Sequence, residues 1–275
     1  RARLGVETAM GIADLAAAYA ALLGARGPQR GWLNALPGDL ATFFRLGDAA
    51  NAAAQEAIRF LARRPALPLE ARVIFRREEI RPLPMFSRSG KILTLRWPSD
   101  PSRFLEAPHS LLNLPRIEAR FASSAAGPGD SIGLPSGIGA LRVEPALGVV
   151  IGRPISRASM DAARAGIAGV TVLTAVSAAD EPFATDQPWL SSNCDRFTPI
   201  ACQLATLDEI GAFDSVRLTA QVNGERAAER TLAGARFDAS VLASAISTVT
   251  RLEPGDVLAV MFGSVRSEEH TSELQ

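Results

Sequence analysis

The sequence contains very little lysine, histidine, cysteine and tyrosine. Lys91 is the only lysine among 29 basic residues, and there are two histidines, two cysteines and one tyrosine. No stretch reaches the roughly 18 uninterrupted apolar residues that a transmembrane helix needs, so none is predicted. The alanine-rich stretch 12–23 contains Asp14 and has no cationic flank with a cleavage site, which favours an ordinary helix over a signal peptide.

The chain also lacks an excess of charge of either sign. Its formal net charge is zero, so nothing in the composition favours a nucleic acid or an anionic membrane as partner. Cys194 and Cys202 have seven residues between them, which is not a recognised metal-binding or redox spacing. We therefore expect free thiols in a reducing compartment and a cytoplasmic protein.

The 275 residues are 47% hydrophobic and 21% charged, which is enough for a buried core and one small extra domain. Apolar spacing predicts helices over 12–23 and 39–64, after a short strand at 3–6. Prolines recur between residues 65 and 84 and predict a boundary near residue 85. We expect a small, mainly helical N-terminal domain over 1–85.

The remainder of the chain is richer in strands. Apolar or β-branched runs predict strands at 91–95, 147–151, 170–176 and 257–262. Asn223-Gly224 predicts a hairpin, and Ser159 and Asp238 are expected to cap helices. Because strands outnumber helices without strict alternation, the fold class is predicted to be α+β.

The last ten residues, 266–275 (RSEEHTSELQ), do not continue the apolar pattern of the preceding strands. They look like a sequencing adapter translated in frame. We expect them to be a non-native tail outside the folded core, which would then cover 86–265. The chain also starts without methionine, so we expect the natural protein to extend beyond both ends.

Several segments after Lys91 occur in an order and at spacings that resemble the fumarylacetoacetate hydrolase family. They are GPGDSIGLP at 127–135, ALGVVIGR at 146–153, AGVTV at 168–172, DRFTPIA at 195–201, QVNGE at 221–225 and LEPGDVLA at 252–259. RLGVE at 3–7 resembles the start of the family's small N-terminal domain. The resemblance implies a β-rich core of mixed sheets rolled into a partial barrel.

The resemblance also implies a Mg²⁺ or Mn²⁺ site that serves carbon–carbon bond cleavage of 2-oxo or diketo acids, as in aromatic catabolism. Such a site uses a Glu-x-Glu on one strand and an Asp on a later strand, since a hard dication takes oxygen ligands and alternate strand residues share a face. Here Glu144 stands at the first Glu position, Ala146 at the second and Ala175 at the Asp. Glu144 is thus a remnant ligand or an edge-strand carboxylate, and we expect no bound metal.

Other family positions also differ. Arg120 replaces a lysine and is the candidate substrate-binding residue, although its planar guanidinium differs from an ammonium group. Ser192 replaces a second lysine, and Ala179 replaces an arginine. Arg96 begins the segment RWPSD, which stands where the family has Asn-Tyr-x-x-His. His109 lies beyond the family's base position and is either a loop histidine or a catalytic base.

Three functions remain open. The chain has lost metal-dependent catalysis and acts as a non-catalytic subunit that forms a homo-oligomer or pairs with an active relative. Alternatively, it is an active hydrolase or lyase, a decarboxylase or hydratase, on a small 2-oxo acid, with ligands rebuilt from other residues. Asp180, Glu181 and Asp186 are either such a new cation site or solvated loop acids. In a third interpretation it is a fragment of a larger enzyme. The geometric prediction is that Glu144 and Ala146 share one face of their strand, with Ala175 nearby on the next.

Overall fold

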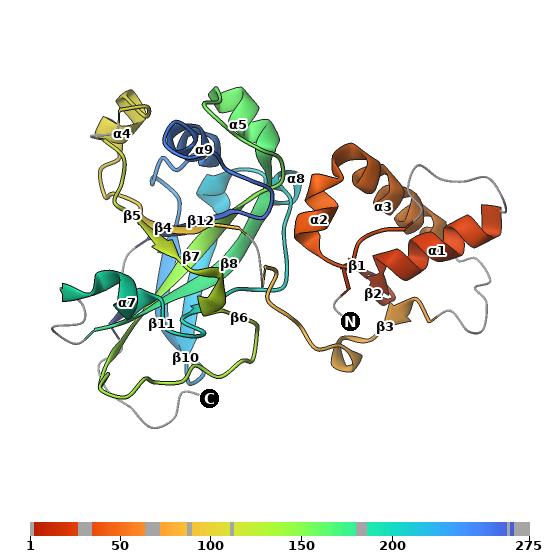
Figure 1. Cartoon of the computed structure of the whole chain (residues 1–275), viewed down its shortest axis with the longest axis horizontal. Helices are drawn as coiled ribbons and strands as arrows, with labels where there is room; N and C mark the ends of the chain where they lie inside the picture. Colours follow the sequence, from red (N-terminus) through yellow and green to blue (C-terminus); the bar gives the residue numbers. More distant parts are fainter. Residues whose placement is uncertain are drawn as a thin grey trace. The chain divides into compact units, whose positions relative to one another are not determined.

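The computed structural model describes residues 3–26, 35–63, 72–86, 90–110, 113–179, 186–262 and 265–266 (Figure 1). The chain divides into two compact units, Arg1–Pro82 and Leu83–Gln275, and the division falls close to residue 85. Each unit has its own cluster of buried apolar side chains. None of the helices in the described part of the chain is both long enough and apolar enough to cross a membrane.

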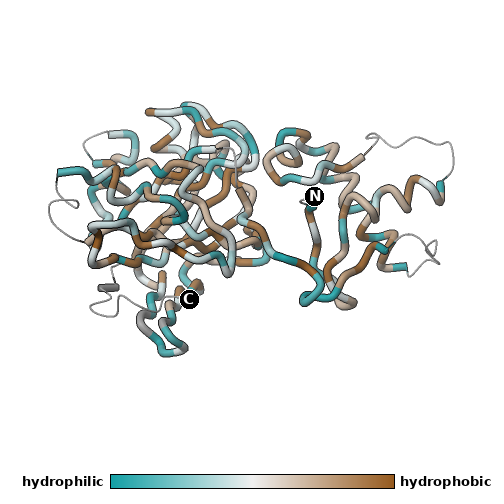
Figure 2. Tube along the Cα trace, turned by 60° about the horizontal axis from the view of Figure 1, so that its bottom comes forward, coloured by the Kyte–Doolittle hydropathy of each residue, from teal (hydrophilic) through white to brown (hydrophobic). Residues whose placement is uncertain are grey.

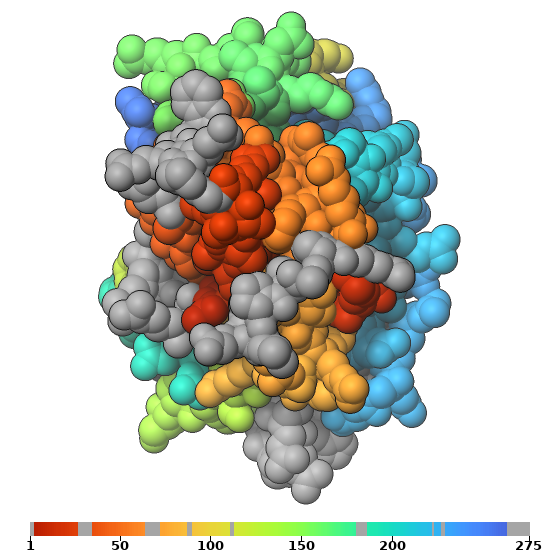
Figure 3. All heavy atoms as spheres, turned by 90° about the vertical axis from the view of Figure 1, so that its right-hand side faces the viewer, coloured from red at the N-terminus to blue at the C-terminus, as the bar shows by residue number. Residues whose placement is uncertain are grey.

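The first unit combines a small antiparallel sheet with helices. The sheet has the order β1 (Gly5–Thr8), β2 (Gly11–Asp14) and β3 (Ile74–Phe75). The helices are α1 (Leu15–Arg26), α2 (Leu40–Arg45) and α3 (Gly47–Ala62), with a 3₁₀ turn at Arg77–Glu79. Helices α1 and α3 pack against each other, and Figure 3 shows the face of this unit where both reach the surface.

The first helix begins later than the sequence predicted, because residues 12–14 belong to strand β2. Gly11 has φ +129°, and a Cβ there would lie 2.6 Å from the carbonyl oxygen of Phe75, so only glycine lets β2 approach β3. Asp14 then accepts a hydrogen bond from the backbone N–H of Ala17 at 3.0 Å. This cap satisfies a free N–H of the first turn and sets the helix start at Leu15.

The second unit is built on a mixed sheet of six strands. The strands are β4 (Ile92–Arg96), β5 (Ile117–Arg120), β7 (Leu141–Ile151), β8 (Ile167–Ala178), β12 (Val257–Met261) and β13 (Val265–Arg266). Strand β7 pairs with β8 on one side and with β12 and β13 on the other, followed by β4 and β5. Strand β12 runs parallel to β4, and the other pairings in this sheet are antiparallel.

One face of this sheet forms the main core. Leu95, Leu147 and Val260 lie on this face and pack in one cluster with Leu242 and Ile246 of helix α9 (Ala239–Ser247). Helix α5 (Met160–Gly166) packs against α9. Figure 2 shows hydrophobic stretches running through this unit, with hydrophilic stretches at its outer loops. The core therefore lies between the sheet and α9.

The predicted caps and hairpin of this unit form as the sequence indicates. The hydroxyl of Ser159 accepts from the N–H of Ala162, and Asp238 accepts from the N–H groups of Ser240 and Val241. The Asn-Gly turn, with positive φ at both residues, joins β10 (Arg217–Val222) and β11 (Glu225–Thr231). Shorter elements are α4 (Ser102–Glu106), α7 (Pro188–Ser192), α8 (Leu207–Ile210), β6 (Ala125–Ala126), β9 (Thr198–Pro199) and the 3₁₀ turns Ala122–Ser124 and Phe213–Ser215.

The two edge strands of the large sheet, β5 and β8, do not pair with each other, but other elements connect them. Helix α7 contacts both β5 and β8, and β6 pairs in parallel with β9. The N–H of Val176 on β8 donates to the carbonyl oxygen of Phe197 at 2.9 Å. Among the described residues no ladder joins β5 to β8, so the sheet is curled and bridged but is not a closed barrel. The fold is a mixed α+β fold with several sheets.

Candidate functional site

The three positions at which the family resemblance implies metal ligands come together on one face of the large sheet. Glu144 of β7 is the direct partner of Ala175 on β8 in the antiparallel ladder. Ala146 follows Glu144 by two residues and therefore points to the same face. Glu144 is 5% exposed, whereas Ala146 and Ala175 are fully buried. The geometric prediction agrees with this register, but the edge-strand interpretation of Glu144 is wrong because β7 is paired on both sides.

The carboxylate of Glu144 forms an ion pair with Arg96, the last residue of β4. Terminal nitrogen Nη2 of Arg96 contacts Oε1 of Glu144. The register places Arg96 beside Met261 of β12, and Met261 beside Ala146 of β7, so the arginine side chain reaches across one strand. Its side chain is 47% exposed, whereas that of Glu144 is 7% exposed. A buried carboxylate is thus neutralised by a half-exposed guanidinium.

Sequence reasoning did not identify Arg96 as a partner of Glu144. The signal was the alternation along β4, where Ile92, Thr94 and Arg96 share a face and only Arg96 is exposed. A charged residue at the end of an otherwise buried strand needs a partner or access to solvent. Here it has both.

Arg120 ends β5 and is 6% exposed. Its Nη1 donates to the carbonyl oxygens of Val176 at 2.7 Å, Ser192 at 2.9 Å and Phe197 at 3.0 Å. These contacts connect β5 to β8 and to helix α7. Its Nε has no hydrogen-bond partner in the described part of the chain. Burial lowers the pKa of Arg120 to about 10, although the nearby carboxylates of Glu118 and Glu144 act in the opposite direction.

Polar side chains next to Arg120 fix helix α7 against β5. Asn193 accepts from the N–H of Phe121 at 2.6 Å and donates to the carbonyl oxygens of Trp189 at 2.7 Å and Ala119 at 3.2 Å. The hydroxyl of Ser192, at a position where the family resemblance implies lysine, donates to the carbonyl oxygen of Pro188 within its own helix at 3.0 Å. The Ser192 hydroxyl therefore satisfies a backbone carbonyl group of its own helix. Asn193 has a structural role that the sequence did not predict.

The other candidate residues lie apart from Glu144 or outside the described residues. His109 is exposed in the turn after α4, and in the described ranges no hydrogen bond or ion pair joins it to Glu144 or Arg120. Asp186 is exposed, and Asp180 and Glu181 lie outside the described residues. Both cysteines are free. Burial, with a smaller contribution from Asp195, raises the pKa of the Cys194 thiol and so disfavours its nucleophilic thiolate.

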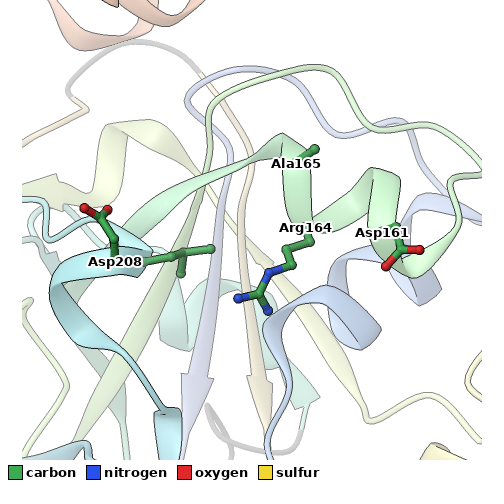
Figure 4. Close-up of a pocket in the computed structure, with 5 residues that line it drawn as sticks. Asp161, Arg164, Ala165 and Asp208 are labelled. Carbon is green, nitrogen blue, oxygen red and sulfur yellow. The ribbon is translucent and has the colours of Figure 1, made fainter.

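No group of three or more His, Cys, Asp or Glu side chains in the described ranges is arranged to hold a metal ion. A surface pocket is present between helices α5 and α8, lined by Asp161, Arg164, Ala165, Leu207 and Asp208. Figure 4 shows Asp161, Arg164 and Ala165 on one helix and Asp208 on the other. The residues that sequence reasoning proposed for catalysis, substrate binding or metal binding do not line this pocket.

Comparisons with known proteins place this geometry in context. A family model described as fumarylacetoacetate (FAA) hydrolase C-terminal matches residues 102–273. Fumarylacetoacetate hydrolase domain-containing protein 2 from Pongo abelii is 29% identical over 225 residues, which cover 81% of this chain and 68% of that protein. The mitochondrial oxaloacetate tautomerase Fahd2a from Rattus norvegicus is 32% identical over 145 residues, 52% of this chain and 46% of that protein. The chain thus spans about half the length of several curated relatives that it matches.

Solved structures share the fold over nearly the whole chain. A Mycobacterium smegmatis protein provisionally named HpcE has a TM-score of 0.69 at 26% identity and covers 95% of this chain and 84% of its own. A maleylpyruvate hydrolase from Sphingobium sp. SYK-6, in complex with manganese(II) and pyruvate, has a TM-score of 0.66 at 19% identity, with 96% and 88% covered. At 19% identity, this second likeness concerns the fold alone.

Proposed function

Because the chain belongs to the fumarylacetoacetate hydrolase family, we propose that it keeps the family scaffold without metal-dependent catalysis and acts as a non-catalytic or pairing subunit. The observation that carries the proposal is the register of β7 and β8. It places Ala146 and Ala175 beside Glu144, where the family resemblance implies two further carboxylates. One carboxylate then remains at these three positions, where the family resemblance implies three.

The side chains on this face do not fit a divalent cation. Mg²⁺ requires near-octahedral oxygen coordination and gives up its water reluctantly, so a single carboxylate holds it poorly. The methyl groups of Ala146 and Ala175 supply no oxygen ligand, and both residues are fully buried. The carboxylate of Glu144 already contacts Arg96. A cation would have to displace this guanidinium and would gain only one acidic ligand.

Titration of the unmodified chain with Mg²⁺ and Mn²⁺ tests this proposal. We expect calorimetry to give no saturable heat up to millimolar metal, because only Glu144 supplies a carboxylate at the three positions. A relative that retains all three acids is the positive control under the same conditions. Stoichiometric binding at millimolar affinity or tighter by the unmodified chain would contradict the loss of the metal site.

The pairing role predicts that the chain associates with itself or with an active relative. Two aromatic side chains beside the site support an interface: Phe121 is 51% and Trp189 is 55% exposed, with ring centroids 6.3 Å apart. Exposed aromatic residues of this kind are enriched where proteins associate. Light scattering at micromolar concentration should therefore give at least the dimer mass. The monomer mass alone, with or without a metal-binding relative present, would count against pairing.

A second candidate function is an active hydrolase or lyase on a small 2-oxo acid. It is favoured by the buried guanidinium of Arg120, whose Nε has no partner in the described part of the chain and which could serve a carboxylate. Curated relatives are named as oxaloacetate tautomerases, and oxaloacetate is a small 2-oxo acid. Proton NMR of oxaloacetate with the purified chain, with and without Mn²⁺, would reveal turnover above the uncatalysed rate.

A further inference from the structure

Arg96 is the one charged side chain that the structure pairs with Glu144 in the described part of the chain. The two residues are 48 positions apart in the sequence, so the contact is made by the fold. Arg96 lies on the row of β4, β12 and β7 that also contains Met261 and Ala146. The guanidinium therefore reaches Glu144 from the side of the sheet on which Ala146 also lies.

We infer that the guanidinium of Arg96 is a built-in cation that takes the place of a divalent metal ion against Glu144. This inference rests on the proposed function, because it applies only if the chain holds no metal there. A guanidinium stays protonated throughout the physiological pH range, so it supplies a fixed positive charge that cannot be lost by dilution or chelation. One side chain thereby supplies the positive charge that a metal ion would otherwise supply beside Glu144.

The burial of Glu144 explains why such a cation is needed. A nearly buried carboxylate without a partner is strongly unfavourable, whereas an ion pair with a charge-assisted hydrogen bond offsets its loss of hydration. Arg96 can serve because its own side chain remains about half exposed and keeps part of its hydration. Arg120 is also near but is directed to backbone carbonyl groups. Arg96 thus balances the charge of Glu144 at a place where alanines 146 and 175 provide no ligands for a metal ion.

The inference predicts competition between Arg96 and a metal ion once the missing carboxylates are restored. The background for this test is the double variant Ala146→Glu/Ala175→Asp. We expect adding Arg96→Ala to strengthen Mn²⁺ binding at least about tenfold, because a positive charge in contact with Glu144 disfavours a second cation there. Mn²⁺ binding is read from the electron paramagnetic resonance signal of the free ion and from calorimetry, so no activity is needed.

The matched control is Arg116→Ala in the same background. Arg116 precedes β5 and pairs with Glu118 at 3.1 Å, with 77% and 41% of the two side chains exposed. Its removal subtracts the same charge from the same unit without touching Glu144. Equal Mn²⁺ affinities of the Arg96→Ala and Arg116→Ala variants would overturn the inference and leave the proposed function intact. Mn²⁺ binding by the unmodified chain would instead overturn the proposed function.

A second measurement needs no added carboxylates and so does not depend on how the double variant folds. In the unmodified chain, Arg96→Ala should lower the melting temperature, and adding Glu144→Gln should recover a large part of the loss. The recovery is expected because the neutral amide no longer needs a cation, whereas an arginine that stabilises the unit independently of Glu144 would give additive losses. Additive effects of Arg96→Ala and Glu144→Gln would overturn the inference.

Discussion

Replacing Asp256 with alanine is expected to lower the free energy of unfolding of the larger unit by about 3 to 5 kcal/mol, because two backbone N–H groups lose a charged acceptor and hydrogen bonds to charged groups contribute about 1.5 to 3 kcal/mol each. Asp256 is fully buried. Its carboxylate accepts from the backbone N–H of Lys91 at 2.6 Å and of Glu253 at 2.8 Å, and it pairs with the ammonium of Lys91 at 2.7 Å. These contacts tie together the starts of the parallel strands β4 and β12, which carry Arg96 and Met261.

Chemical denaturation followed by tryptophan fluorescence measures this loss. Glu253→Ala is the matched control, since Glu253 lies three residues before Asp256 and carries the same charge. It forms an exposed ion pair with Arg251, in which the Glu253 side chain is 46% and the Arg251 side chain 61% exposed. Exposed pairs of this kind contribute at most about 1 kcal/mol. Similar losses for Asp256→Ala and Glu253→Ala would show that the buried carboxylate does not hold the two strands together.

Local patterns were sufficient to predict several elements of this fold. The Asn223-Gly224 hairpin and the caps at Ser159 and Asp238 depend on residues within a few positions of one another, so the sequence alone contains the information. The start of the first helix was misjudged because the apolar residues Ile12 and Ala13 continue the helical pattern backwards. The decisive feature there is the pairing of β2 with β3, which comes from residues about 60 positions later.

The sequence predicted which strand positions form the candidate site, but it did not predict the side-chain contacts made there. The family resemblance placed Glu144 and Ala146 on one strand and Ala175 on a neighbouring strand, and the register brings them together. The partner of Glu144 could not be predicted, because Arg96 reaches it across β12 and the pairing of β4 with β12 joins segments about 165 residues apart. The carbonyl contacts of Arg120 also depend on backbone from three separate segments.

Restoring the two missing carboxylates is expected to create a metal site that the unmodified chain lacks. In Ala146→Glu/Ala175→Asp, three carboxylates would share one face, because Glu144 and residue 175 are direct partners and residue 146 lies two positions along β7. Three acids are the minimum that the family resemblance implies for Mg²⁺ or Mn²⁺. Both alanines are fully buried, so the new acids should destabilise the metal-free protein and make its stability depend on metal.

Thermal unfolding with increasing Mn²⁺ measures this gain. The melting temperature of the double variant should rise with metal concentration, and that of the unmodified chain should not, since only a native-state site is stabilised by its ligand. Binding should also strengthen as the pH rises, because protons compete with the metal for the carboxylates. Restored turnover is not expected, since the position of the family's base stays unchanged in this variant. A control with two acids on the opposite face, Leu147→Glu/Val149→Asp, buries the same charges away from Glu144. A Mn²⁺ response in that control as large as in the double variant, or none in either, would contradict the site.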